Sequence, residues 1–110
     1  MSNKIPYIAE FEELVILAIL KLGPNAYGAS IYEALEEAGR STAIGALYTT
    51  LSRMEEKGLV KSWMGESTPE RGGRAKKYFK VEASGLRAVK ERERSRRRLY
   101  PKLARFGGKA

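Results

Sequence analysis

Residues Thr42–Gly58 read Thr-Ala-Ile-Gly-Ala-Leu-Tyr-Thr-Thr-Leu-Ser-Arg-Met-Glu-Glu-Lys-Gly, and the rest of the sequence is best understood from this segment. At the 3.6-residue period of an α-helix, one side of this stretch is apolar and is predicted to be buried. The apolar stripe consists of Ile44, Leu47, Tyr48, Leu51 and Met54. The opposite face carries small and hydroxylated side chains with one cation: Thr42, Gly45, Ala46, Thr49 and Arg53. Because a surface helix normally presents Glu and Lys there, this face favours close approach to a polar, anionic surface such as the DNA major groove.

The residue inventory excludes several classes of protein. The 110 residues contain no Cys and no His, and all 13 acidic residues are Glu. Disulfides, thiolate metal sites and the usual nucleophile–base pairs cannot be built from this set. The sequence therefore predicts no enzyme, no metal and no cofactor. The N-terminus lacks a signal-peptide pattern, and the apolar run Leu14–Leu20 is too short to span a bilayer, so we expect a cytoplasmic protein with no membrane partner.

The positive charge is concentrated near the C-terminus. The net charge is +8, yet residues 1–82 hold 11 Lys and Arg against 11 Glu, whereas residues 83–110 hold 10 against 2. A basic segment of this kind attracts nucleic acid or an acidic membrane surface. An Arg-rich helix with a solvated outer face accounts for the same composition, and the charge count alone does not separate the two interpretations.

Two further helices are predicted before the opening stretch. Periodicity indicates helices at Glu10–Leu22 and Tyr27–Ala38, and Ser41 or Thr42 is the expected N-cap of the third helix. Glutamates in the first turn of the first helix suit the helix dipole and are interpreted as solvated cap residues. These are Glu10, Glu12 and Glu13. Two helices joined by a short turn that contains glycine match a helix-turn-helix.

The segment after the third helix predicts a β-hairpin. Strand-forming residues occupy Leu59–Gly65 and Ala75–Val81, and the turn-rich loop 66–74 separates them. A basic hairpin in this position makes a winged helix-turn-helix, with wing cations that track DNA phosphates. These cations are Arg71, Arg74, Lys76 and Lys77.

The predicted fold is mainly α (α+β), a winged helix-turn-helix with one hairpin. Residues 1–82 would form the winged helix-turn-helix, and residues 83–110 would form a C-terminal helix and basic tail of the same domain. The last helix is predicted at Ala83–Tyr100, ending near Pro101. The side of this helix that would pack against another helix, which we call its seam, has few apolar residues and is charged in the middle. It therefore does not predict a strong coiled coil. Packing against the first helix and packing against a second copy both fit, and the dimerisation candidates are Leu86, Val89, Glu93, Arg96 and Tyr100.

An ordered set of short matches resembles the PadR family of winged-helix transcription regulators. The matching segments are Leu22-Gly23-Pro24, Tyr27-Gly28, Gly45-Ala46-Leu47-Tyr48, Arg53-Met54-Glu55, Lys57-Gly58-Leu59-Val60, Gly73-Arg74 and Lys77-Tyr78-Phe79. The resemblance implies a dimer through the C-terminal helix, an inverted-repeat operator, a groove-facing Gly45–Tyr48 and wing contacts at Gly73-Arg74 and Lys76-Lys77. The wing departs from the family pattern at Ala75, where proline is common.

These observations predict a homodimeric, sequence-specific repressor of double-stranded DNA, released by a small-molecule effector or a partner. The predicted recognition-helix contacts are Thr42, Gly45, Ala46, Tyr48, Thr49 and Arg53, with the Tyr48 phenol reaching a phosphate. Two alternatives stay open. One is an architectural DNA- or RNA-binding protein that uses the basic tail without sequence preference. The other is a winged helix that binds only protein.

Overall fold

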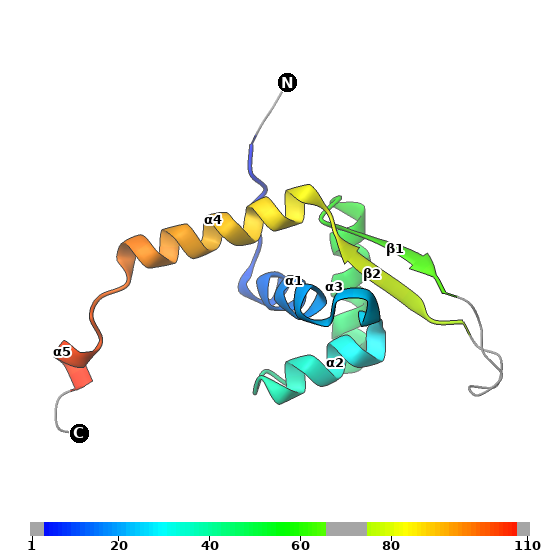
Figure 1. Ribbon diagram of the computed structural model, residues 1–110, viewed down its shortest axis with the longest axis horizontal. Helices are drawn as coiled ribbons and strands as arrows, with labels where there is room; N and C mark the ends of the chain where they lie inside the picture. The colour runs from blue at the N-terminus through cyan, green and yellow to red at the C-terminus, as the bar shows by residue number, and fades with distance from the viewer. Residues whose placement is uncertain (1–3, 66–74, 108–110) are drawn as a thin grey trace.

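The computed structural model describes residues 4–65 and 75–107. The structure is mostly helical with one antiparallel hairpin, as the sequence predicts (Figure 1). Its elements in chain order are α1 (Glu10–Leu22), the 3-10 turn η1 (Gly23–Asn25), α2 (Gly28–Glu37), α3 (Ile44–Glu56), β1 (Val60–Met64), β2 (Lys77–Val81), α4 (Ala83–Leu99) and α5 (Ala104–Gly107). The short α5 is the only described α-helix that the sequence analysis does not predict.

The apolar side of α3 packs into the core through Leu47, Leu51 and Met54, each at most 1% exposed. The sequence predicts that Ile44 and Tyr48 are buried with the rest of the apolar stripe. This is wrong, because they are 45% and 49% exposed. At 100° per residue, Ile44 and Tyr48 point about 50° and 90° away from the middle of the buried side. The buried face of α3 is therefore narrower than the sequence stripe.

The helix α3 begins later than predicted. Its N-cap is Ala43, and no side chain caps its first turn. The prediction of Ser41 or Thr42 as the cap is therefore wrong, because the chain stays non-helical up to Ala43. The first backbone N–H groups of α3 thus have no side-chain acceptor within the described chain.

The hairpin is joined to the start of α2 by a third extended segment. Strands β1 and β2 pair antiparallel, with Val60 opposite Val81 and Ser62 opposite Phe79. The Phe79 amide donates to the Ala26 carbonyl at 2.8 Å, and Tyr27 bridges to Tyr78. Since Val60 and Phe79 are buried on one face, the sheet covers the helical core and fixes the hairpin beside the N-terminus of α2.

The glutamates at the start of α1 bind cations from other elements. Glu10 pairs with Arg40, just past α2, at 2.9 Å. Glu12 accepts from the Ala9 amide at 2.9 Å and from Lys57 Nζ, just past α3, at 2.8 Å. The cap interpretation is confirmed for Glu12, whose carboxylate accepts from the N-cap amide of Ala9, but Glu12 is not solvated, since it is only 8% exposed.

Glu13 is the most deeply buried acid among the described residues, at 3% exposure. Its Oε1 accepts from Arg92 Nε at 3.0 Å and from Arg96 Nη2 at 3.1 Å, both on α4. Arg92 Nη1 also donates to the Ile8 carbonyl at 2.8 Å. The solvated-cap interpretation is wrong for Glu13, which ties α1, the N-terminal arm and α4 together.

The first half of α4 is seated on the core. A Cβ atom on Gly85 would lie 2.4 Å from the Leu59 carbonyl oxygen, so only glycine permits this approach. Ala88 and Val89 are buried. The second half of α4 leaves the body of the molecule and leads to α5 (Figure 1). None of the described helices is long and apolar enough to cross a membrane.

The Glu12 contacts predict acid sensitivity. Burial on its own would raise the Glu12 pKa, but the hydrogen bonds from Lys57 and the Ala9 amide bring the pKa below its ordinary 4.5. A carboxyl with a lower pKa in the folded state stabilises above its unfolded pKa, and this stability is lost as pH falls through the folded value. Urea unfolding should therefore show a falling free energy of unfolding below pH 4.5.

Glu12→Gln should remove about 1–3 kcal/mol of stability at pH 7, the scale of a hydrogen bond to a charged group. It should also flatten the acid dependence. Glu33→Gln, at an exposed site on α2, is the matched control and should change neither. Equal pH profiles for wild type and Glu12→Gln would contradict this account.

Candidate nucleic-acid interface

The outward face of α3 is formed by Gly45, Thr49 and Ser52, which are all exposed. At 100° per residue these three residues lie opposite the buried leucines of α3. Thr42 precedes the helix and is half-buried, so it is not part of this helical face. Ser52 is missing from the sequence prediction, although the same helical period places it beside Thr49. We call Gly45, Thr49 and Ser52 the α3 face.

A shallow pocket of about 390 Å³ borders the α3 face on the hairpin side. It is lined by Tyr27, Gly28, Ala29, Tyr48, Ala75, Lys76 and Lys77. The Tyr48 ring packs directly against Gly28, where a Cβ atom would lie 2.3 Å from the Tyr48 hydroxyl oxygen. The pocket therefore joins the start of α2, the start of α3 and the hairpin, and it presents a phenol and two lysines to solvent.

The two described wing lysines have different surroundings. Lys76 Nζ lies 4.0 Å from the centre of the Tyr27 ring, a cation–π contact that holds the ammonium at the pocket. Lys77 Nζ lies 3.9 Å from Glu55, which also accepts from Ser62 at 2.7 Å. Lys76 is therefore the less neutralised of the two. The other predicted wing residues, Arg71, Gly73 and Arg74, lie outside the described residues.

The opposite edge of the α3 face is also basic. Arg53 and Lys57 line a second shallow pocket with Tyr7 and Thr50. Lys57 is engaged by Glu12, whereas Arg53 forms no ion pair with any described residue. Ala46 and Arg53 are exposed on this side of α3. Cations thus flank the small, hydroxylated α3 face on both sides, with Lys76 on one and Arg53 on the other.

The predicted dimerisation residues fall into different environments. Val89 is 7% exposed and belongs to the core of its own chain, and Arg96 is bound to Glu13. Glu93 pairs with Arg97 one turn along the same helix. Leu86 and Tyr100 are 38% and 59% exposed.

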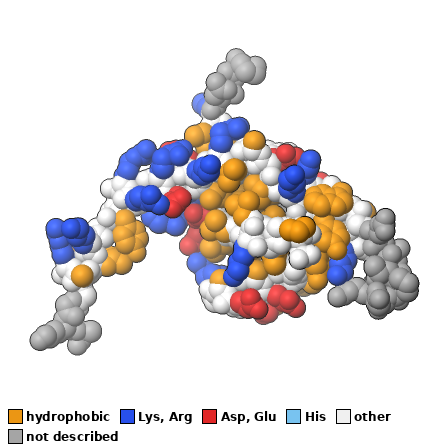
Figure 2. All heavy atoms as spheres, in the orientation of Figure 1, with side chains coloured by type: hydrophobic (Ala, Val, Ile, Leu, Met, Phe, Trp, Pro, Cys, Tyr) orange, Lys and Arg blue, Asp and Glu red, His pale blue; other side chains and the backbone are white. Residues whose placement is uncertain are grey.

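Other apolar side chains are exposed on α1 and the C-terminal segment. They are Leu17, Leu20, Leu99, Leu103 and Phe106. Figure 2 shows apolar side chains on the C-terminal segment that projects from the body of the molecule. Together with Leu86 and Tyr100, these residues provide apolar surface that the described part of the chain leaves uncovered.

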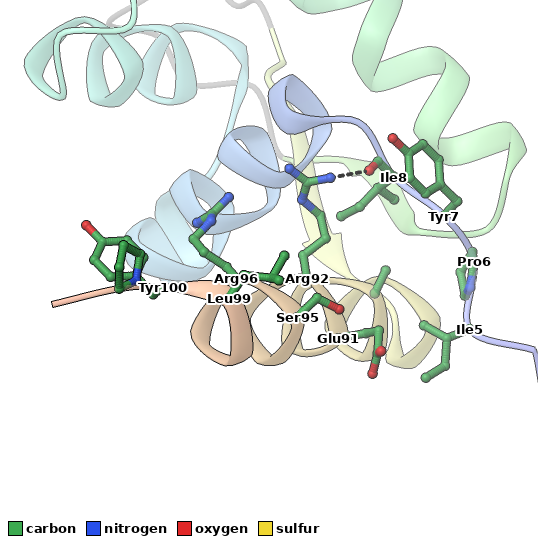
Figure 3. A pocket seen from close by; sticks show the side chains of 12 residues that line it. Ile5, Pro6, Tyr7, Ile8, Glu91, Arg92, Ser95, Arg96, Leu99 and Tyr100 are labelled. Atoms are coloured by element: carbon green, nitrogen blue, oxygen red, sulfur yellow. Dashed lines mark hydrogen bonds between the residues drawn. The ribbon is translucent and has the colours of Figure 1, made fainter. Parts of the chain in front are cut away.

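A larger pocket, of about 610 Å³, lies between the N-terminal arm and α4 (Figure 3). Its apolar lining includes Ile5, Tyr7, Leu99 and Tyr100. Its polar side chains include Glu91, Ser95 and the two arginines that hold Glu13. The pocket can therefore take a small apolar molecule and offers guanidinium groups to a negative end.

A helix with a small polar outer face, flanked by cations and followed by a hairpin, is the geometry of a winged helix-turn-helix. Residues 16–91 match the transcriptional regulator PadR-like family. The chain belongs to the PadR-like family. It is therefore a DNA-binding transcriptional regulator, and the matched region runs from α1 through the hairpin into α4.

Solved PadR-like structures have the same fold. A PadR-like transcription factor from Bacteroides fragilis shares 31% identity, with a TM-score of 0.67 and coverage of 81% of this chain and 82% of that one. A PadR regulator from Clostridium difficile R20291 shares 26%, with a TM-score of 0.67 and coverage of 89% and 99%. One from Eggerthella lenta DSM 2243 shares 26%, with a TM-score of 0.67 and coverage of 92% and 88%. No curated protein matches the sequence.

The contact between Gly28 and Tyr48 predicts a coupled pair in this PadR-like chain. Gly28→Ala forces the Tyr48 ring to move, because the new methyl group would lie 2.3 Å from its hydroxyl oxygen. Overpacking of this kind costs about 1–3 kcal/mol of stability. Once Tyr48→Ala has removed the ring, adding Gly28→Ala should cost little. Urea unfolding of the four proteins of this double-mutant cycle measures the coupling, and additive effects would contradict the packing.

Proposed function

We propose that this PadR-like regulator is a homodimeric, sequence-specific repressor that binds an inverted-repeat operator. The observation that carries the proposal is the α3 face, where Gly45, Thr49 and Ser52 are exposed between the cations Lys76 and Arg53. Small side chains allow the helix to approach the floor of the major groove, and the two hydroxyl groups donate to or accept from base edges. The flanking cations would contact the phosphates on either side of the groove.

The residues around the α3 face would make different kinds of contact with DNA. Thr49 and Ser52 would read bases, and Gly45 and Ala46 would permit close approach. Tyr48 and Lys76 would contact one phosphate backbone, and Arg53 with Lys57 the other. The wing residues Arg71, Gly73 and Arg74 would extend the backbone contact on the hairpin side, as the family resemblance implies.

A second copy would cover the apolar surface that the chain leaves exposed. Leu17 and Leu20 on α1 are 43% and 46% exposed, and Leu99 is 83% exposed. Two-fold pairing through these helices would bring two α3 faces to one side of DNA, with half-sites about 34 Å apart. The charged members of the predicted seam, Glu93 and Arg96, contribute less because each is already paired within its own chain.

Effector release would use the pocket between the arm and α4. Arg92 and Arg96 line this pocket and also hold Glu13. A small molecule with an apolar body and a negative end would compete with Glu13 for the two guanidinium groups. The position of α4 relative to the body, and with it the spacing of the two α3 faces, would then change.

Fluorescence anisotropy with operator and scrambled duplexes tests the proposed contacts. Thr49→Ala with Ser52→Ala should lower the ratio of operator to scrambled affinity by about 5-fold or more, since each lost neutral hydrogen bond is worth about 0.5–1.5 kcal/mol. Lys76→Gln should weaken both duplexes equally and reduce the salt slope by about 0.9. The duplexes come from the region upstream of the regulator's own gene.

Glu33→Gln, on the exposed side of α2, is the control and should change neither quantity. Retained discrimination in the Thr49→Ala, Ser52→Ala variant would contradict the reading role of the α3 face.

The same titration, repeated with small aromatic and aliphatic carboxylates, tests effector release. Operator affinity should fall in wild type, and this response should be weakened in Ile5→Ala, which changes the lining of the pocket outside the proposed dimer surface.

A further inference from the structure

The basic residues of α4 fall into two groups with opposite orientations. The helix carries seven Lys and Arg against two Glu. Arg92 and Arg96 turn inward to the buried Glu13. The other five point outward, and we call them the α4 stripe: Arg87, Lys90, Arg94, Arg97 and Arg98. All five are exposed, and Figure 2 shows Lys and Arg side chains along the outer edge of α4.

Helical geometry places the α4 stripe along one line. Positions 87, 90, 94, 97 and 98 follow the spacing i, i+3, i+7, i+10 and i+11, which keeps them on one face of an α-helix. Each of the roughly three turns from Arg87 to Arg98 presents at least one cation. The row is about 16 Å long, at 1.5 Å per residue. The buried residues Gly85, Ala88 and Val89 lie on the other side of the helix.

Neither the helix dipole nor local pairing accounts for this row. Cations are favourable in the last turn of a helix, which covers Arg97 and Arg98 but not Arg87 and Lys90 in the first half. Arg94 pairs with Glu91 at 2.9 Å and Arg97 with Glu93 at 2.5 Å. Exposed pairs of this kind are weak and are readily exchanged for another anion.

Arg87, Lys90 and Arg98 form no ion pair with any described residue. The stripe is therefore a linear array of cations with little internal neutralisation. Its spacing of about 5.4 Å per turn suits a partner whose negative charges also lie in a row. Duplex DNA, with one phosphate charge per about 1.7 Å of its axis, is such a partner.

We propose that the α4 stripe binds the phosphate backbone of duplex DNA without sequence preference, at a place other than the base pairs read by α3. This inference rests on the proposed function, which brings DNA to the protein. The contact between Glu13 and the two inward arginines fixes the rotation of α4 about its axis, so that the stripe keeps facing outward. The stripe also leaves Leu99 uncovered, because Leu99 lies on the side of α4 that carries Gly85, Ala88 and Val89.

The test compares two triple variants that remove the same charge. The first, Arg87→Gln, Lys90→Gln and Arg94→Gln, removes the N-terminal part of the stripe. The second, Lys21→Gln, Lys102→Gln and Arg105→Gln, removes three exposed cations that lie outside the α4 stripe, the α3 face and the hairpin. Affinity for a scrambled 40-base-pair duplex is measured from 50 to 200 mM salt. The stripe variant should reduce the slope of log K against log salt by about 2.7, at about 0.9 per lost phosphate contact.

The control variant should reduce the slope of log K against log salt by less than ~0.9, which is the value expected for one lost phosphate contact. The ratio of operator to scrambled affinity should stay at its wild-type value in the stripe variant, because base contacts are untouched. Equal slopes for both variants would show a general charge effect and overturn the proposal. Unchanged duplex binding with loss of binding to RNA or to anionic vesicles would also overturn it. If the wild-type protein prefers the operator to the scrambled duplex but the stripe variant keeps the full salt slope, the proposal for the α4 stripe is contradicted. The proposed function is not affected by that result.

Discussion

The buried carboxylate of Glu13 is the constraint on which the arrangement of this molecule depends. A carboxylate that is 3% exposed must be paired, because an unpaired buried charge is strongly unfavourable. Its partners are Arg92 and Arg96, and Arg92 reaches on to the Ile8 carbonyl. One acid therefore fixes the N-terminal arm and the direction in which α4 leaves the body. Its neighbours in the same turn of α1, Glu10 and Glu12, tie down the residues that follow α2 and α3.

This arrangement links the two regions that a regulator must connect. The α3 face belongs to the body of the molecule, whereas the exposed apolar surface lies on α1 and the C-terminal segment. The arginines that hold Glu13 also line the pocket between the arm and α4. A ligand in that pocket and the Glu13 carboxylate would therefore use the same two guanidinium groups. In a dimer held through α4, the angle of α4 to the body would set the distance between the two α3 faces.

Local patterns in the sequence predict most of the elements. The helical period gives α1 to α4 within about two residues, and the alternation around Phe79 gives the hairpin and its buried side. The outer face of α3 follows from the same period, including Ser52, which the prediction left out. The N-cap of α3 is not predictable in this way, because Ser41 and Thr42 have suitable side chains yet stay outside the helix.

Contacts between distant residues are not encoded in any local pattern. Glu12 and Glu13 look like ordinary first-turn acids, and their burial depends on Lys57, Arg92 and Arg96, which lie 45, 79 and 83 residues away. The same limit applies to the seam of α4. Whether Val89 faces its own core or a second chain depends on how α4 docks on the body, and in this structure Val89 lies in its own core.

We propose that Glu13 sets the position of α4 and would thereby set the separation of the two α3 faces in a dimer. The chain has no native cysteine, so Glu37→Cys on the exposed side of α2 can carry a single spin label per protomer. Double electron–electron resonance should give one narrow distance for the otherwise wild-type protein and for a control with Glu56→Ala, at an exposed site that forms no ion pair with a described residue. Adding Glu13→Ala should broaden or shift that distance while the winged helix stays folded. The same narrow distance in the Glu13→Ala protein would contradict the account.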